Sequence, residues 1–246
     1  MDTRKIKFVV NRPWLNKDSD SAPKPVIKTI PDWYKDADRF AKHPVTGEYW
    51  KDPQNGGKIP TWKACPSVYD IMGAGYVYRT PCDIEFKENT YGQIEAKVLD
   101  EKNRDFLQIR PPMPGFKTPY GYHDFHFAWW ADWAVEVPEG YSVLYTQPFN
   151  RFELPFLTTS GIIDNDKVHL PGTMPFFVAK GFQGILPAGT PYAQMLPFRR
   201  EHWESEVEDS IRYDDMLDKN MKNSDKYRVS DGGIYQREVW ERRKYE

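Results

Sequence analysis

Cysteine is scarce in this sequence: among its 246 residues only Cys65 and Cys82 carry a thiol. Neither belongs to a C-x-x-C pair, so their spacing matches no zinc motif. The N-terminus also lacks the apolar stretch of a secretory signal, since the short apolar run at 8–10 ends at Asn11. We therefore expect two reduced thiols in a cytoplasmic protein, without a disulfide.

Excess charge and long apolar runs are lacking as well. The formal net charge is −2, whereas proteins that bind nucleic acid usually present a strongly basic face. Two modest basic runs, at 222–228 and 237–244, are interrupted by acidic residues. No stretch approaches the roughly 18 consecutive apolar residues of a membrane helix. We expect neither a nucleic acid nor a membrane as a partner, and nucleic-acid binding is the weakest hypothesis.

Turn formers and aromatic residues are abundant, with 21 Pro, 16 Gly and 15% aromatics. This composition is typical of short strands joined by many turns. Apolar and polar residues alternate at 83–86, 93–99 and 106–109, as they do in antiparallel strands. Predicted strands recur about every ten residues, which is typical of β sandwiches and jelly rolls.

One pattern occurs twice in the chain. Residues 133–151 and 182–200 align without a gap at an offset of 49 residues, and each copy has a Pro-x-Gly turn between two predicted strands. Pro138 of the first copy matches Pro187 of the second. In architecture the doubled pattern resembles the cupin superfamily, and it predicts that the two prolines occupy equivalent corners of a jelly roll.

The resemblance to cupins does not extend to their metal site. Cupins place a metal-binding histidine three residues after the glycine of this turn. Here that position holds Tyr192 in the second copy and Val143 in the first. Neither is a usual ligand for catalytic iron or zinc. We expect a cupin-like architecture that lacks this ligand, and no cofactor.

The predicted fold class is mainly β: a jelly-roll or cupin-like double-stranded β sandwich or barrel with a C-terminal amphipathic helix. Residues 1–60 are expected to supply an N-terminal strand, a short helix and a long loop that pack on the core. Residues 61–200 are expected to form the β-sandwich core, and residues 201–246 a charged helical tail.

The tail has the pattern of a helix with one apolar face. Trp203, Val207 and Ile211 recur at four-residue steps between strongly charged residues. Such a helix suits self-association, or contact with a phage or host protein partner.

Three histidines are weak candidates for a metal site. His123 and His126 are three residues apart in a predicted strand, so their side chains point to opposite faces unless a bulge intervenes. One interpretation is a pair of histidines that hydrogen-bond to the backbone. The other is a facial triad of His126, His169 and a carboxylate.

Two carboxylates and an arginine are further candidates. Asp164 and Asp166 flank Asn165 in a predicted turn, and carboxylates at alternate positions can hold calcium. The rest of an EF-hand pattern is missing, and a solvated turn explains the same residues. Arg199, at the end of the second copy, suits either an anion ligand or a solvated rim.

Four phrases point to a family. They are KIPTWKACPSVYDIMGAGYVYRTPCDIEF (58–86), PEGYSVLYTQPFN (138–150), SGIIDND (160–166) and GTPYAQMLPFRREHW (189–203). In this order they resemble an uncharacterised family of proteins from tailed phages of marine bacteria, including cyanophages. The resemblance covers roughly residues 31–203. It implies a phage-encoded, β-rich protein located in the host cytoplasm or the virion, and it brings no known activity or cofactor. The polar residues of these phrases are candidates for ligand binding: Asn150, Asp164, Asp166, Gln194 and Arg199.

Two functions follow from these patterns, and they leave open whether the protein is an enzyme. The leading hypothesis is a non-catalytic structural or host-molecule-binding protein of a phage, because the residues supply no consistent catalytic set. The alternative is a cupin-like enzyme or small-molecule binder that uses the barrel interior. This alternative requires Asn150, Asp164, Gln194 and Arg199 to converge inside the barrel.

Overall fold

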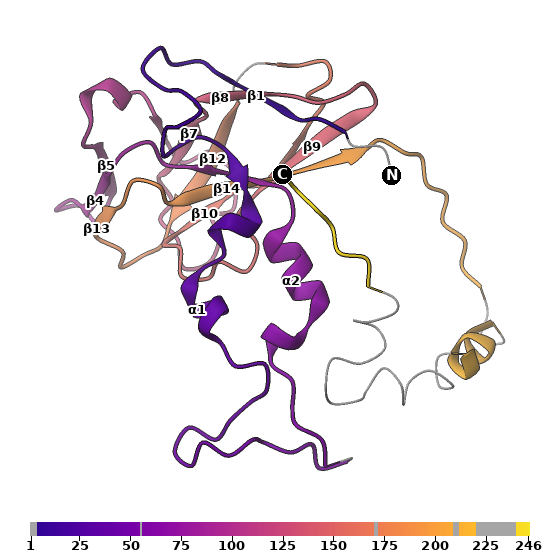
Figure 1. The fold of residues 1–246 in the computed structure, drawn as a ribbon. Helices are drawn as coiled ribbons and strands as arrows, with labels where there is room; N and C mark the ends of the chain where they lie inside the picture. The colour runs from indigo at the N-terminus through magenta and orange to yellow at the C-terminus, as the bar shows by residue number, and fades with distance from the viewer. Residues whose placement is uncertain (1–3, 55, 170–171, 209–211, 220–239) are drawn as a thin grey trace. The chain divides into compact units, whose positions relative to one another are not determined.

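The chain forms two units (Figure 1). The computed structural model describes residues 4–54, 56–169, 172–208, 212–219 and 240–246. Unit 1 comprises Met1–Thr29, Ala74–Arg200 and Tyr245–Glu246, and unit 2 comprises Ile30–Gly73 and Glu201–Lys244.

Unit 1 contains the β-strands. They are β1 (Lys7–Val10), β2 (Lys24–Pro25), β3 (Tyr76–Arg79), β4 (Ile84–Glu88), β5 (Ile94–Val98), β6 (Leu107–Arg110), β7 (His126–Trp130), β8 (Trp133–Glu136), β9 (Tyr141–Thr146), β10 (Phe156–Thr158), β11 (Gly161–Ile163), β12 (Thr173–Val178), β13 (Gly184–Leu186) and β14 (Pro191–Arg199). Unit 1 also has two short 3₁₀ helices: η1 (Val26–Thr29) follows β2, and η3 (Glu101–Asn103) lies between β5 and β6.

These strands form several antiparallel sheets. The largest has the order β11-β9-β14-β3-β2, and a four-stranded sheet has the order β10-β12-β7-β6. Strands β13, β4 and β5 form a third sheet, and β1 pairs with β8. The prediction of a mainly β fold is confirmed, whereas the described residues form no barrel.

The alternation of residue types determines which side chains face the core. In β4, Ile84 and Phe86 are buried while Glu85 and Lys87 are exposed, as expected when successive side chains of a strand point to opposite faces. The period-two pattern read from the sequence therefore corresponds to one buried and one solvated face.

Aromatic rings fill the core of unit 1. Trp129 of β7 stacks on Phe176 of β12, with ring centroids 3.6 Å apart and planes inclined by 7°. The ring of Tyr192, on β14 in the five-stranded sheet, lies 5.0 Å from that of Trp129. The indole Nε1 of Trp129 donates a hydrogen bond to Thr158 Oγ1 at 3.0 Å. The two sheets are thus joined by ring contacts and by the hydrogen bond of 2.7 Å that Thr158 Oγ1 donates to the carbonyl oxygen of Tyr192.

The doubled pattern has a structural counterpart. In both turns the residue after the glycine donates a backbone hydrogen bond of 3.2 Å, to the carbonyl oxygen of Pro138 in the first copy and of Pro187 in the second. The glycines have φ of 82° at Gly140 and 80° at Gly189, a left-handed conformation that glycine adopts without strain. The two Pro-x-Gly turns are therefore alike.

The second strands of the two copies are neighbours. Strands β9 and β14 pair antiparallel, with Thr146 opposite Gln194 and Tyr145 opposite Met195. At the offset of 49 residues, Thr146 is equivalent to Met195 and Tyr145 to Gln194, so this pairing has a local two-fold symmetry. The first strands differ, because β8 pairs with β1 and β13 pairs with β4.

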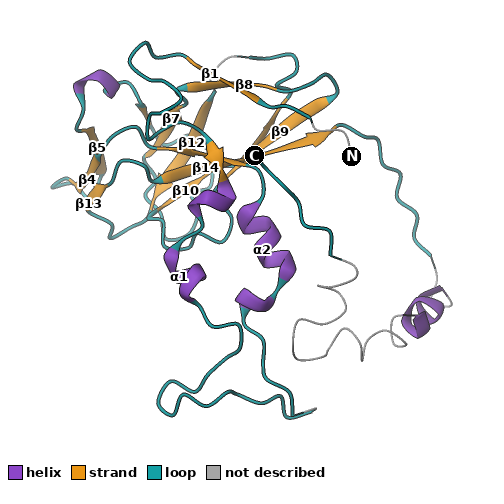
Figure 2. Cartoon of the chain, viewed as in Figure 1, coloured by secondary structure: helices purple, strands orange, loops and turns teal. Residues whose placement is uncertain are grey.

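Unit 2 contains two short α-helices, a 3₁₀ helix and a projecting arm. The helices are α1 (Asp32–Asp36) and α2 (Pro66–Gly73), and the 3₁₀ helix is η2 (Trp62–Ala64). Between α1 and η2 the chain runs out and back, and we name residues 38–61 the arm; Figure 2 shows it as loop beyond both helices. Isolated antiparallel bridges join Phe40 to Pro60, Lys42 to Tyr49 and Lys51 to Lys58.

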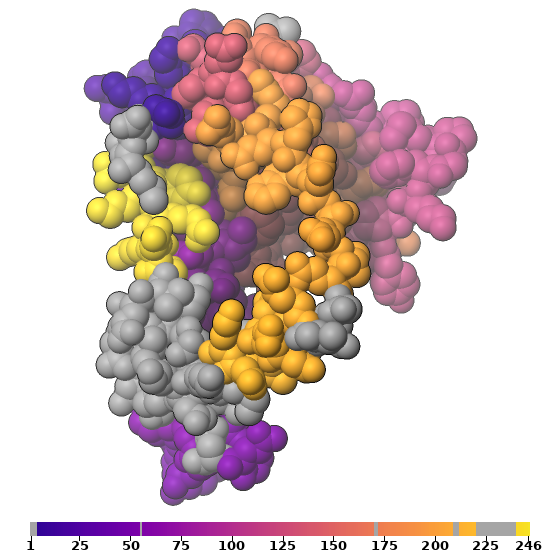
Figure 3. Space-filling model, turned by 90° about the vertical axis from the view of Figure 1, so that its right-hand side faces the viewer, coloured from indigo at the N-terminus to yellow at the C-terminus, as the bar shows by residue number. Residues whose placement is uncertain are grey.

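The tail differs from the predicted helix at its start. Residues 201–208 form neither helix nor strand, and helix is found at 212–219. The prediction that the helix begins near Trp203 is therefore wrong. Residues 209–211 and 220–239 of the predicted helical tail lie outside the described residues. Residues 201–208, which precede this gap, belong to the orange part of the chain, seen at the surface in Figure 3. Trp203 is 86% exposed and Val207 is 96% exposed, so this segment lacks the packing that stabilises an amphipathic helix.

None of the helices in the described parts of the chain has the length and apolar character needed to cross a bilayer.

Candidate functional site

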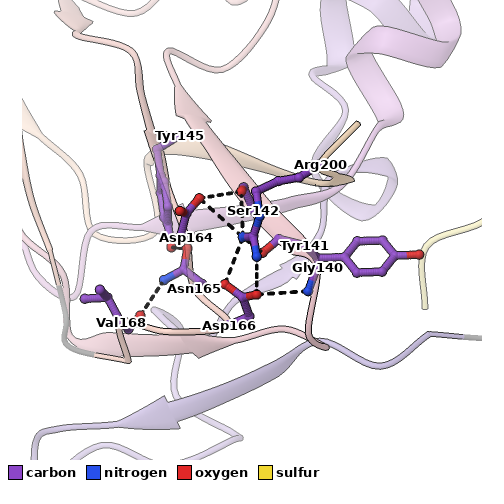
Figure 4. A network of polar contacts seen from close by, with 9 residues as sticks. All are labelled: Gly140, Tyr141, Ser142, Tyr145, Asp164, Asn165, Asp166, Val168 and Arg200. Atoms are coloured by element: carbon purple, nitrogen blue, oxygen red, sulfur yellow. Dashed lines mark hydrogen bonds and ion pairs between the residues drawn. The ribbon is translucent and has the colours of Figure 1, made fainter. Parts of the chain in front are cut away.

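The acidic turn after β11 is held from within unit 1 (Figure 4). Asn165, at its centre, is 1% exposed. Its Oδ1 accepts a hydrogen bond from the hydroxyl of Tyr145 at 3.0 Å, and its Nδ2 donates to the carbonyl oxygen of Val168 at 3.2 Å. The buried asparagine thus fixes the turn, and the two flanking aspartates point to another set of donors.

Arg200 binds both aspartates of the turn. Its Nη1 donates to Asp166 Oδ1 at 2.9 Å, and its Nη2 donates to Asp166 Oδ2. The backbone N–H of Gly140 donates to the same carboxylate at 2.9 Å. Asp164 Oδ1 lies 3.3 Å from Arg200 Nη1 and accepts a hydrogen bond of 2.6 Å from the hydroxyl of Ser142. Both carboxylate oxygens of Asp166 and one of Asp164 therefore contact donors of the protein itself.

The charges of this network stabilise one another. Hydrogen bonding to Arg200 holds the pKa of Asp166 well below its ordinary value of 3.8. The same contact raises the pKa of Arg200. A bidentate pair of this kind is stronger than a single hydrogen bond between neutral groups. We interpret the network as a clamp that ties the first Pro-x-Gly turn to the end of β14, rather than as an open calcium site.

Two other predicted site residues, Gln194 and Asn150, have structural roles. Gln194 is 0% exposed; its Oε1 accepts from the N–H of Phe149 at 3.0 Å and its Nε2 donates to the carbonyl oxygen of Ala74 at 2.7 Å. Asn150 has a φ of 57°. Asparagine tolerates this left-handed conformation better than most residues do. Gln194 is thus needed to link two backbone segments inside the protein, and Asn150 to form a turn.

The predicted residues do not converge on one site. Arg199, at the end of β14, is exposed, whereas Gln194 is buried in the same strand. Asp164 belongs to the Arg200 network, and Asn150 lies in a turn. Of the five predicted residues, the structure brings together only Asp164 and Asp166. A ligand site made by all of them inside the sheets therefore has no support.

Tyr192, at the position of the cupin histidine, belongs to the core. Its ring stacks on that of Tyr78 at 5.8 Å and 20°, and it makes an edge contact with Phe106 at 5.5 Å. Burial raises the pKa of the Tyr192 hydroxyl, so it stays protonated at neutral pH. The residue that replaces the expected metal ligand fills the interior instead.

The histidines do not form a metal site. His126 is 3% exposed and its ring stacks on Phe177 at 4.9 Å. Burial lowers the pKa of His126, with a further contribution from Arg110. His123 is also buried, whereas His169 is exposed. Within the described residues, no group of three or more His, Cys, Asp and Glu side chains is arranged to hold a metal ion.

Unit 2 presents exposed aromatic residues that are not among the predicted site residues. On the arm, Tyr49 is 40% exposed and Trp50 is 50% exposed. The ammonium of Lys58 lies 4.0 Å from the centroid of the Tyr49 ring, and that of Lys42 lies 5.4 Å from it. The ring of His43 stacks on Trp50 at 5.6 Å. Cation–π and stacking contacts thus hold these rings at the surface.

The main hydrophobic core lies in unit 1, which also leaves rings such as Tyr91 and Tyr120 exposed. In unit 2, large side chains such as Trp33, Val45 and Trp62 are exposed by 42%, 86% and 56%. A signal for this existed in the sequence: the aromatic residues of the arm lie between proline and glycine residues, where no sheet can bury them.

Comparison with known proteins adds no relative. No protein-family model matches the chain, and no curated protein matches its sequence.

Proposed function

We propose that this is a non-catalytic protein that binds another protein, with unit 1 as the scaffold and the arm of unit 2 as the main contact surface. In this proposal it is a structural or host-molecule-binding protein of a phage, acting in the host cytoplasm or within the virion. The resemblance of its phrases to a phage family is the reason for the biological setting.

The apolar side chains exposed on the arm carry the proposal. Unit 1 holds the main aromatic core and also exposes single rings such as Tyr91, whereas the arm displays Tyr49, Trp50 and Val45 within one short segment. Protein interfaces are enriched in aromatic side chains, and exposed apolar patches mark interaction sites. The arm is also nearly balanced in charge, which favours a protein over a nucleic acid. It has four cations, at Arg39, Lys42, Lys51 and Lys58, and three acids, at Asp38, Glu48 and Asp52.

The alternative of a ligand inside the sheets is less well supported. The place where a cupin binds its metal is taken by the ring of Tyr192, in contact with Trp129 and Tyr78. The jelly-roll or cupin-like topology remains part of the proposal; the similar Pro-x-Gly turns and the paired β9 and β14 support it.

The tail is a candidate for a second contact surface. Beside Trp203 and Val207, the helical residues Tyr213, Met216 and Leu217 are exposed by 62%, 53% and 38%. Apolar side chains in this number are stabilised when another chain covers them. We propose the tail as a site of self-association or of contact with a phage or host protein.

The test compares matched variants of the arm and the scaffold. Tagged wild-type protein, a Tyr49→Ser/Trp50→Ser variant and a Tyr91→Ser variant are incubated with host extract and with disrupted particles, and bound proteins are quantified by mass spectrometry. Tyr91 is 86% exposed and belongs to unit 1. The proposal predicts a protein that wild type and Tyr91→Ser retain equally and that the arm variant loses. Equal retention by all three would contradict it.

A further inference from the structure

Unit 2 contains a pocket of about 260 Å³ on helix α2. Its uncharged walls are Cys65, Pro66, Tyr69 and Trp240, and its cations are Arg39, Lys63 and Arg242. The volume is below that of pockets for drug-sized ligands, roughly 300–1,000 Å³. It suits one ring together with one small charged group.

The chain segment that includes Trp240 is fixed against α2 by polar contacts. Trp240 Nε1 donates to Asp70 Oδ2 at 2.9 Å, and Arg243 Nη1 donates to the same oxygen at 2.8 Å. The ring of Trp240 meets that of Tyr69 edge-on at 5.9 Å. Arg242 donates to the Tyr69 hydroxyl at 2.6 Å. Two aromatic walls and a guanidinium are therefore held in a defined arrangement.

Two cations of this pocket, Lys63 and Arg242, make no ion pair with a carboxylate of the described residues. The carboxylate of Asp70 binds Arg243, which does not line the pocket. Lys63 donates to the backbone carbonyl oxygens of Tyr34 and Lys35, at 2.8 and 2.7 Å. Cations beside apolar walls attract an anion, because the attraction is stronger where water is partly excluded.

We propose that this pocket binds a small anion, a carboxylate or a phosphate, attached to a flat apolar group. The flat group lies against Tyr69, Trp240 and Pro66, and the anion faces Arg242 and Lys63. The proposal goes beyond the contact surface of the arm, because it assigns a ligand of defined chemistry to a pocket that shares only Arg39 with the arm.

Cys65 supplies the measurement, because it lines the pocket. Its alkylation by iodoacetamide is followed in the full chain by peptide mass spectrometry, with N-acetylphenylalanine, phenyl phosphate or the neutral N-acetylphenylalanine amide present. Cys82 is the internal control: it is 7% exposed, and burial raises its pKa to about 12. Its labelling reports unfolding, since the thiolate is the reactive form.

The proposal predicts that an anionic probe slows the labelling of Cys65 in a saturable way and that the amide does not. The anion that protects Cys65 at the lower concentration identifies the preferred charged group. Arg242→Gln should raise the concentration for half-protection about tenfold, as expected for the loss of one charge-assisted contact. Lys244→Gln makes the same charge change outside the pocket and should have no effect.

Equal protection by the acid and its amide would overturn the proposal, and so would the absence of protection by both anions. An unchanged concentration dependence in Arg242→Gln would overturn it too. The Tyr49→Ser/Trp50→Ser variant keeps every residue of the pocket. Loss of partner binding in that variant, with protection of Cys65 intact, therefore separates the two proposals.

Discussion

Replacing Phe176 with alanine removes the ring at the centre of the unit 1 core. Phe176 is 0% exposed. Its ring lies 3.6 Å from Trp129, 5.6 Å from Phe127 and 5.9 Å from Phe156, measured between centroids. The substitution therefore deletes a buried ring and leaves a cavity that its neighbours, themselves rigid rings, cannot easily fill.

The expected loss in the free energy of unfolding is about 3–5 kcal/mol, the range for Phe→Ala in well-packed cores. This is a large part of the roughly 5–15 kcal/mol that stabilises a typical domain. The measurement is urea denaturation followed by near-ultraviolet circular dichroism, which reports the packing of aromatic side chains, with linear extrapolation to water. Phe176→Leu should lose less, because leucine keeps much of the apolar volume.

Ile109→Ala is the matched control. Ile109 lies in β6 of the same sheet but is 72% exposed, so its truncation should change stability by less than about 0.5 kcal/mol. A loss below about 1 kcal/mol for Phe176→Ala, close to that of the control, would refute the close-packed core on which the scaffold role of unit 1 rests.

Four further substitutions test the backbone and the charges. Gly75→Ala should severely impair folding, because φ is +73° and a Cβ atom would lie 2.0 Å from a backbone oxygen of β14. Gly47 has a φ of +72° but open space around it, so Gly47→Ala should lower the free energy of unfolding by only about 1–2 kcal/mol. Thermal unfolding compares the two variants. Asp166→Asn should destabilise the protein near neutral pH, because it removes a carboxylate whose pKa is lowered in the folded state. The stability difference from wild type should shrink below about pH 4, where the wild-type carboxylate also becomes protonated. Asp132→Asn should show the opposite trend: burial raises the pKa of Asp132 to about 6, so wild type should gain stability relative to this variant as the pH falls from about 7 to about 4. Urea midpoints from about pH 7 down to about pH 2 check both variants, and the same trend in both would contradict the assigned environments.

The sequence predicts the strands better than it predicts the site. Alternation at 83–86 corresponds to β4, because one face of that strand meets the core and the other meets solvent. The Pro-x-Gly repeat predicts two similar turns, since the φ required at Gly140 and Gly189 is encoded locally. Sequence spacing does not reveal whether a polar side chain is already bound within the chain.

The Arg200 network and the tail show what local patterns omit. Asp166 and Arg200 are 34 residues apart, and their contact depends on how β9, β11 and β14 pair. The four-residue apolar pattern at Trp203 indicates a helix, yet helix formation depends on packing of the apolar face, and Trp203 is 86% exposed. The exposed rings on the arm have only an indirect signal in the sequence, the proline and glycine residues around them, because burial is a property of the fold.

Photo-crosslinking from two positions tests the central claim most directly. A photoreactive phenylalanine replaces Trp50 on the arm in one variant and Tyr91 in unit 1 in the other; both side chains are exposed, by 50% and 86%. Each variant is irradiated in the cells that produce the protein, and crosslinked products are identified by mass spectrometry. The account predicts a discrete crosslinked protein from position 50 and none from position 91. Crosslinks from position 91 alone would contradict the assignment of the contact surface to the arm.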